Sequence, residues 1–154
     1  AEWNSGDSSR WRATFTEDAV LKVRGSVYPI EIRRDGYEFF AVLGHEMVVK
    51  GCVSGSDGEV VCVAESTQRF TDGLGLPPTE VELRLLFVDG LISEYREHFV
   101  GAGGVRAAWR DFVDWIAERN PADARAVQPH PGDALGAEIA LSYMDEYFEG
   151  EEPQ

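Results

Sequence analysis

Residues 79–99, "TEVELRLLFVDGLISEYREHF", alternate apolar and polar side chains on both sides of Asp89-Gly90. Successive side chains of a strand point to opposite faces, so this alternation predicts two strands that each have one apolar face. An Asp-Gly pair adopts the positive φ angles that a tight hairpin turn requires. The segment therefore predicts an antiparallel hairpin, whose first strand presents Val81, Leu83, Leu85 and Phe87 on its buried face.

The second strand of this hairpin carries charged residues between apolar ends. Counted from Leu91, the period of two places Tyr95, Glu97 and Phe99 on the face that the first strand makes apolar. His98 has the opposite parity, and we expect it to face away. A carboxylate enclosed among apolar side chains is destabilising unless it is paired or used, so Glu97 is the main candidate catalytic residue, with Tyr95 beside it.

The rest of the chain predicts helices on both sides of a run of strands. Periodic apolar residues predict helices at about residues 8–17, 34–43, 104–119 and 134–148. In the third of these helices we expect Trp109, Phe112 and Ile116 to form the packed stripe. Two further strands, "MVVKGCVSG" and "EVVCVAESTQRF", precede the hairpin and complete a four-strand antiparallel run. This order predicts an α+β domain with one curved sheet.

Length and charge limit the classes of function. With 154 residues, 44% of them hydrophobic, the chain fits one globular domain with a core of its own. The formal net charge is −14, from 28 acidic and 14 basic residues, so we expect neither nucleic acid nor an anionic membrane as a partner. The sequence has no apolar run near the ~20 residues of a spanning helix and no basic-then-apolar leader, so we expect a cytoplasmic protein.

The two cysteines and three histidines do not indicate a metal site. Cys52 and Cys62 flank the turn "SGSDG", so they could lie on paired strands, and without a secretory signal we expect both thiols to be reduced. His45, His98 and His130 are scattered and lack metal-ligand spacing. We therefore expect no metal and no cofactor.

Several of these segments together resemble the nuclear transport factor 2-like superfamily. They are "FTEDAVLKVRG", "RRDGYEFF", the hairpin-rich middle and "DGLISEYREHF". The superfamily includes SnoaL-like polyketide cyclases, ketosteroid isomerases and limonene epoxide hydrolases. The resemblance covers roughly residues 1–119 and implies a cone-shaped, strongly bent antiparallel sheet wrapped around helices, with a small-molecule pocket inside the cone. Residues 120–133 then form a Pro-rich connector, and residues 134–150 an additional C-terminal helix.

Only one of the catalytic positions of the epoxide hydrolases has a clear match in this sequence. Glu97 matches their essential acid on the last strand. They also use an Arg and an Asp two residues apart on the strand that reads "CVAESTQ" here, whereas this chain offers Glu65 and Thr67, or Ala64 and Ser66 if the register slips by one. In either register the Arg is missing, so the three-residue apparatus is incomplete.

The resemblance to ketosteroid isomerase leaves its catalytic positions unfilled. The positions that match its base and its protonated acid are Val23 and the neighbourhood of Leu83, and both are apolar. Isomerisation by that mechanism is therefore disfavoured.

The two ends of the chain share a short pattern. "EYFEGE" (146–151) echoes "EWNSGD" (2–7), and alignment on the Gly places Tyr143 where ketosteroid isomerase has its oxyanion-hole tyrosine. Three interpretations stay open: the C-terminal helix is a lid, it replaces the first helix of the superfamily within the chain or from a partner, or the chain belongs to a tandem array. Under the second, Tyr143 points into the cone.

These residues predict a small-molecule enzyme that uses cofactor-independent acid/base catalysis, like a SnoaL-like cyclase or an epoxide hydrolase. The catalytic candidates are Glu97 and Tyr95, together with Glu65 if it faces inward, so that one carboxylate can act as acid and the other as base. We expect the pocket to be lined by Leu21, Val23, Val63, Thr67, Val81, Leu83, Leu85, Phe87, Phe99 and Tyr143. The substrate is expected to be a small hydrophobic organic molecule, and the protein a homodimer that buries the outer face of the sheet. The alternative is a non-catalytic ligand-binding or dimerisation module of the same fold.

Overall fold

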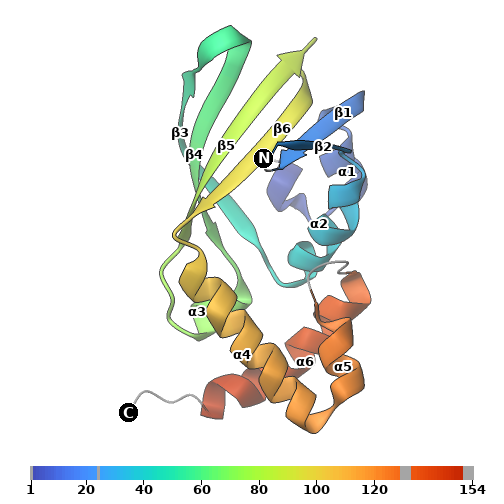
Figure 1. The fold of residues 1–154 in the computed structure, drawn as a ribbon, viewed down its shortest axis with the longest axis vertical. Helices are drawn as coiled ribbons and strands as arrows, with labels where there is room; N and C mark the ends of the chain where they lie inside the picture. Colours follow the sequence, from blue (N-terminus) through green and yellow to red (C-terminus); the bar gives the residue numbers. More distant parts are fainter. Residues whose placement is uncertain (1, 24, 129–132, 151–154) are drawn as a thin grey trace.

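A six-stranded sheet and a group of helices make up the fold (Figure 1). The computed structural model describes residues 2–23, 25–128 and 133–150. The strands are β1 (Phe15–Val23), β2 (Ser26–Pro29), β3 (Glu46–Ser54), β4 (Glu59–Thr67), β5 (Thr79–Val88) and β6 (Leu91–Val100). The helices are α1 (Ser8–Arg12), α2 (Ile32–Val42), α3 (Arg69–Gly73), α4 (Gly103–Arg119), α5 (Pro121–Ala126) and α6 (Ala134–Gly150), with short 3-10 turns at Glu2–Ser5 and Ser56–Gly58.

The strand order is β2-β1-β6-β5-β4-β3, and the predicted α+β class is confirmed. β3, β4, β5 and β6 form the predicted antiparallel run, since each pairs with the next along the chain. The sheet as a whole is mixed, because β1 joins β6 in parallel. A parallel neighbour requires a long crossover connection, which here consists of β2, α2 and the three following strands.

The Asp89-Gly90 hairpin forms as predicted, with φ angles of 51° and 81° in the turn. The register shifts between Leu86 and Phe87, and Ser93 is the extra residue on β6, where its hydroxyl donates to Leu86 O at 3.2 Å. This bulge reverses the predicted parity of the residues before it, so Ile92 packs on the core while Leu91 is 39% exposed. From Tyr95 onward the predicted parity holds.

The first helix is shorter than the predicted 8–17. Asp7 caps its start by accepting from the backbone N–H groups of Ser9 and Arg10, but the helix ends at Arg12 and β1 begins at Phe15. Trp11 and Phe15 do contact each other, with ring centroids 4.9 Å apart. The spacing of four that suggested a longer helix therefore reflects a contact between the helix and the strand that follows it.

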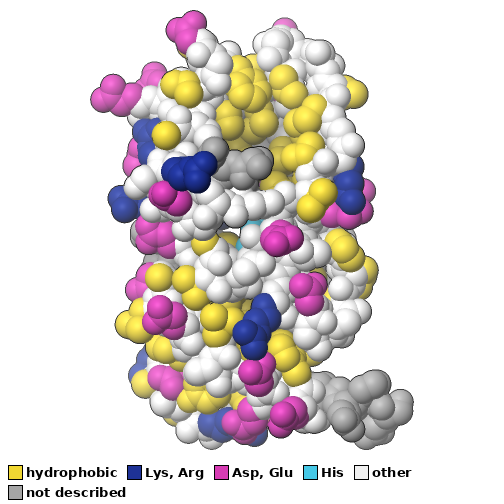
Figure 2. Space-filling view, turned by 180° about the vertical axis from the view of Figure 1, so that it is seen from behind, with side chains coloured by type: hydrophobic (Ala, Val, Ile, Leu, Met, Phe, Trp, Pro, Cys, Tyr) yellow, Lys and Arg dark blue, Asp and Glu magenta, His cyan; other side chains and the backbone are white. Residues whose placement is uncertain are grey.

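Two hydrophobic clusters hold the molecule together, and α2 belongs to both. The sheet cluster contains Trp11, Phe15, Ala19, Leu21, Ile30, Tyr37, Met47, Cys62, Ala64, Val81, Leu83 and Tyr95. The helical cluster contains Phe39, Leu43, Phe70, Phe112, Val113, Ile116, Ala124, Val127, Ala137, Ala140, Met144 and Tyr147. In Figure 1 the sheet with α1 and α2 occupies the upper part of the molecule, and α4, α5 and α6 lie below it. From the opposite side, the upper part is hollowed and the hollow is largely hydrophobic (Figure 2).

The two long C-terminal helices form most of the helical cluster. Phe112 and Ile116 of α4 are fully buried and Trp109 packs against them, as predicted. The predicted C-terminal helix is present as α6, which contacts α2, α3 and α5.

The two cysteines form a disulfide, which corrects the prediction of reduced thiols. Cys52 on β3 and Cys62 on β4 are direct partners in the antiparallel register, and their Cα atoms are 4.0 Å apart. The sequence indicated the pairing of the strands, but the bond depends on the register that brings these two positions opposite each other.

None of the helices within the described residues is both long enough and apolar enough to span a membrane.

Candidate functional site

A cavity of about 1040 Å³ lies between the sheet, α2 and the start of α4. Its size is at the upper end of the range for small-molecule sites. Residues that line it are Asn4, Ser5, Gly6, Lys22, Val23, Arg33, Tyr37, Phe40, Ala41, Gly44, His45, Glu46, Ser66, Gln68, Thr71, Thr79, Glu82, Arg84, Arg96, Glu97, His98, Phe99, Ala102, Val105 and Arg106. The lining mixes apolar and polar side chains, so it is less apolar than the sequence suggested.

Glu97 lines this cavity and is held by two side chains. One carboxylate oxygen, Oε1, forms an ion pair with Arg33, and the other, Oε2, accepts a hydrogen bond of 2.7 Å from the Tyr95 hydroxyl. The side chains of Arg33 and Glu97 are only 15% and 10% exposed. Tyr95 is buried and does not line the cavity, so it supports Glu97 from the protein side.

Helical periodicity explains how α2 brings Arg33 to this place. Arg33, Tyr37, Phe40 and Ala41 follow at intervals of three and four, and all of them line the cavity. The opposite face of the helix, including Phe39, is packed in the helical cluster. The Arg that the sequence lacks on β4 is therefore supplied near Glu97 by a helix, 64 residues earlier in the chain.

The ion pair determines the protonation of its neighbours. Burial acts to lower the pKa of Arg33, but the Glu97 carboxylate and its hydrogen bond outweigh burial and raise that pKa above its usual value. Burial, and next the charge of Glu97, raise the pKa of Tyr95 well above its usual value. At neutral pH the guanidinium is thus charged and the phenol is protonated, as their contacts with a carboxylate require.

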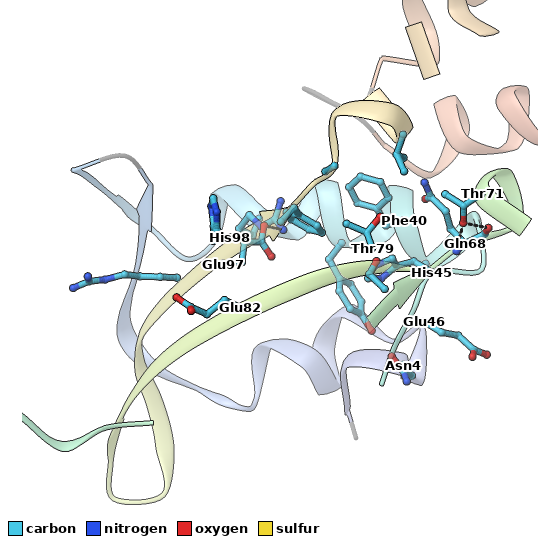
Figure 3. A pocket seen from close by; sticks show the side chains of 18 of the residues that line it. Asn4, Phe40, His45, Glu46, Gln68, Thr71, Thr79, Glu82, Glu97 and His98 are labelled. Carbon is cyan, nitrogen blue, oxygen red and sulfur yellow. Dashed lines mark hydrogen bonds and ion pairs between the residues drawn. The ribbon is translucent and has the colours of Figure 1, made fainter. Parts of the chain in front are cut away.

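His45, like Arg33, lines the cavity but is not among the residues predicted from the sequence. It follows Gly44, whose φ of 67° ends α2, and Figure 3 shows it among the residues that line the cavity. Its Nε2 lies 2.7 Å from Ser66 Oγ. Burial lowers the pKa of His45 to about 4, while Glu97 and Arg33 act on it in opposite directions. The imidazole is therefore neutral at pH 7. A single His before a strand gives no sequence signal of this contact, because Ser66 is 21 residues away.

The cavity lining also includes residues of β5 and β6 whose parity is opposite to that of Glu97. In the described part of the chain, β1 pairs with β6 only as far as Leu21 opposite Tyr95. Beyond that point His98, which was expected to face away, lines the cavity together with Glu82 of β5. Figure 3 shows these two residues and Glu97 on one side of the site, and His45, Thr79 and Gln68 on the other.

Only two of the ten predicted lining residues, Val23 and Phe99, line the cavity. The core residues Leu21, Val81, Leu83 and Leu85 lie on the predicted face, but they pack in or against the sheet cluster beneath the cavity. Phe87 lies near the tip of the hairpin and is 45% exposed. Parity thus predicted the face correctly, but the cavity occupies only the part of that face nearest α2 and α4.

Glu65 does not share the cavity with Glu97. Its carboxylate forms an ion pair with Lys50 at 2.6 Å, and its side chain is 44% exposed. Val63 and Thr67 have the same parity and lie on the same outer face, because Ala64 and Ser66 are the β4 residues that turn inward. Of the two registers that the sequence left open for this strand, the structure has the one in which Glu65 lies on the outer face.

Tyr143 is also absent from the cavity lining. It packs against the helical cluster, and its hydroxyl donates to Asp123 Oδ2 at 2.7 Å. It lies in α6, whose contacts are with helices, so it does not point into the cone of its own chain.

The described residues contain no group of three or more His, Cys, Asp or Glu side chains that could hold a metal ion.

Known structures resemble this fold, although no protein-family model and no curated protein matches the sequence. A protein from Kribbella flavida DSM 17836 superposes with a TM-score of 0.55 at 14% identity, over 71% of this chain and 85% of that chain. The epoxide hydrolase/cyclase-like enzyme SalBIII, which has a role in pyran ring formation in the polyether salinomycin, superposes with a TM-score of 0.52 at 15% identity, over 65% and 83%.

A third similar structure is a SnoaL-like protein from Jannaschia sp. CCS1, with a TM-score of 0.49 at 21% identity, over 66% of this chain and 76% of that chain. Identities this low are informative about the fold and not about the chemistry. The likeness to these two structures supports the predicted α+β fold.

Proposed function

We propose that this chain, which has a nuclear transport factor 2-like fold, is a small-molecule enzyme that uses Glu97 for cofactor-independent acid/base catalysis. The reactions that this arrangement suits are epoxide opening and intramolecular cyclisation of a small, largely hydrophobic organic molecule. The likeness to SalBIII adds to the proposal only through the shared fold.

The observation that carries the proposal is the position of the Glu97 carboxylate. It is largely buried, it lines a cavity large enough for an organic ligand, and it is oriented by Arg33 and Tyr95. A carboxylate has about four lone-pair positions, so two contacts leave it able to accept a proton from a ligand. Carboxylates held in this way in a cleft occur more often at functional sites than in ordinary cores.

The chemistry needs only proton transfer. Glu97 accepts a proton from a water or from a substrate hydroxyl. As it does so, the oxygen of that water or hydroxyl attacks an epoxide carbon and the epoxide C–O bond breaks. The same carboxyl group then returns the proton to the oxygen that is released, so no net proton is gained or lost. Arg33 balances the negative charge before the proton arrives, and the protonated phenol of Tyr95 fixes the orientation of the carboxyl group.

The test is the activity of Glu97→Gln on a panel of cyclohexene oxide, styrene oxide and hydroxy-epoxides that can cyclise, with product analysis by mass spectrometry. The amide keeps the shape of the side chain but cannot take up a proton, so we expect turnover to fall at least ~100-fold, the low end of general acid/base contributions. A melting curve of each variant establishes that it is folded.

The matched control is Glu65→Gln, since Glu65 is an ion-paired carboxylate on the outer face of the same sheet. We expect it to retain wild-type turnover. Equal turnover of wild type and a folded Glu97→Gln variant would refute the catalytic role.

The second candidate is a non-catalytic module that binds a small ligand. One observation favours it: both oxygens of Glu97 have partners within the protein, as in a structural ion pair. In this case the wild type would bind hydrophobic ligands in the cavity but turn over no compound of the panel.

Three further expectations belong to this proposal. The enzyme would need no metal or cofactor, and it would act as a homodimer. A cytoplasmic location stays a prediction from the sequence, and the Cys52–Cys62 disulfide weighs against it, because such bonds persist mainly in oxidising compartments.

A further inference from the structure

We propose that Ser66 is a nucleophile and His45 its base, which gives the cavity an acyl-transfer activity on esters of small apolar acids. This activity is separate from the proton transfer assigned to Glu97. It rests on the geometry of two side chains from different elements that meet at the cavity wall.

The first observation is the contact itself. His45 Nε2 and Ser66 Oγ are 2.7 Å apart, which is the separation that proton transfer from a nucleophilic hydroxyl requires. The contact has this role when the ring carries its proton on Nδ1, so that Nε2 accepts from the hydroxyl.

The second observation is access combined with burial. Both residues line the cavity, and Ser66 is only 8% exposed. β4 turns Ser66 inward, opposite Met47 on β3 and Thr79 on β5, while the end of α2 aims His45 at it. A ligand that enters the cavity therefore reaches a hydroxyl that bulk water does not freely hydrate.

The third observation is a positive charge in the lining of the same cavity. Arg33 lines the cavity together with Ser66, and its charge acts to lower the pKa of His45. A cationic side chain in the lining favours the negative charge that develops on the oxyanion of a tetrahedral intermediate.

The step balances with water as the only co-reactant. Ser66 Oγ bonds to the ester carbonyl carbon as His45 takes the hydroxyl proton. The C–O bond of the ester then breaks, and its alkoxide leaves with that proton as the alcohol, which produces an acyl-serine. Water attacks the acyl-serine, His45 takes its proton and returns it to Ser66, and the carboxylic acid is released.

The experiment uses the whole chain and a fluorophosphonate probe, diisopropyl fluorophosphate. Attack by Ser66 forms an O–P bond and breaks the P–F bond, so the intact mass rises by the mass of the probe minus HF. We expect one adduct per chain, located on Ser66 by peptide mapping, and hydrolysis of 4-nitrophenyl acetate that the adduct abolishes.

Three variants test the assignment. Ser66→Ala should lose the adduct, and His45→Gln should slow labelling at least ~100-fold. The matched control Ser93→Ala should be labelled like the wild type, because Ser93 lies on the same sheet but outside the cavity lining and donates to Leu86 O. Melting curves establish that each variant is folded.

The pH profile supplies a readout that a structural role would not change. With a base whose pKa is about 4, labelling should stay near its maximum down to pH 5 and fall below that. No adduct on the wild type, an adduct that persists in Ser66→Ala, or equal labelling of His45→Gln would each overturn the proposal. Because labelling does not involve epoxide turnover, either proposal can fail while the other stands.

Discussion

At the scale of single residues, the site combines a charged pair with a neutral pair. Arg33 stays charged because the Glu97 carboxylate outweighs the effect of burial on its pKa. For the partly buried His45, Glu97 and Arg33 act in opposite directions, so burial has the largest effect on its pKa and the imidazole is neutral at pH 7. The two pairs can therefore act on a ligand in different ways at the same pH.

The lowered pKa of His45 predicts a dependence of stability on pH. The unfolded chain takes up a proton at its usual pKa of 6.5, whereas the folded chain resists this until about pH 4. The unfolded state thus binds more protons in this window, and the free energy of unfolding falls as the pH drops from 6.5 to 4, by at most about 3 kcal/mol.

Urea unfolding at pH 7, 5.5 and 4 measures this effect by comparing the wild type with His45→Gln. We expect the free energy of unfolding of the wild type, relative to that of His45→Gln, to fall as the pH is lowered from 7 to 4. The exposed His98, replaced in the same way, serves as the control and should follow the wild type. A constant difference between wild type and His45→Gln would contradict the assignment.

At the scale of elements, β3 is an edge strand with little packing of its own. Eight of the nine residues of β3 are exposed, and its only neighbour in the described sheet is β4. The Cys52–Cys62 disulfide joins these two strands across a sequence separation of 10 residues. A covalent bond thus restrains an edge strand that packing holds only weakly.

Removal of this bond should lower the stability of the chain. Loop-closure entropy for a separation of this size corresponds to about 2–3 kcal/mol of unfolding free energy. Urea unfolding of the wild type with and without dithiothreitol should show this loss. The double variant Cys52→Ser with Cys62→Ala should match the reduced wild type and should not respond to dithiothreitol; a wild type that does not respond either would refute the prediction.

At the scale of the whole molecule, the outer face of the sheet exposes apolar side chains that nothing in the single chain covers among the described residues. Val48, Val53 and Val63 lie on that face and are 49%, 66% and 41% exposed. Exposed apolar residues grouped on one sheet face are typical of an interface. The sequence predicts a homodimer on the same grounds.

A charge introduced on this face tests the dimer. We expect light scattering at micromolar concentration to give twice the mass of one chain for the wild type and the mass of one chain for Val63→Glu. Leu135→Glu, at a position on α6 that is 63% exposed, should stay dimeric. A monomeric wild type would contradict the prediction.

The sequence predicts much of this molecule because its strongest signals are local. The alternation within the strand places Glu97, Phe99 and Tyr95 on one face, but the turn alone does not fix which face this is, because the bulge changes the register between the turn and Tyr95. The period fails at Leu91 because a bulge adds one residue, and nothing in the local pattern marks Ser93 as that residue.

The parts of the site that escape prediction come from contacts over long distances in the sequence. Arg33 meets Glu97 across 64 residues, and His45 meets Ser66 across 21. The position of such pairs depends on how α2 packs against the sheet. The residue pattern within the helix or within a strand does not determine that packing. The same limit applies to Cys52 and Cys62, whose bond requires a register and not only a pairing of strands.

The double membership of α2 has a mechanical consequence. Its Tyr37 packs in the sheet cluster and its Phe39 in the helical cluster, and the helix contacts α6 directly. The same helix carries Arg33 near its start and is followed directly by His45, so it links the positions of these two residues to the packing of both clusters. We expect a ligand that engages both residues to stabilise the attachment of α6, although none of the described residues of α6 lines the cavity. If it does, thermodynamic reciprocity requires that loosening α6 weakens the binding of that ligand.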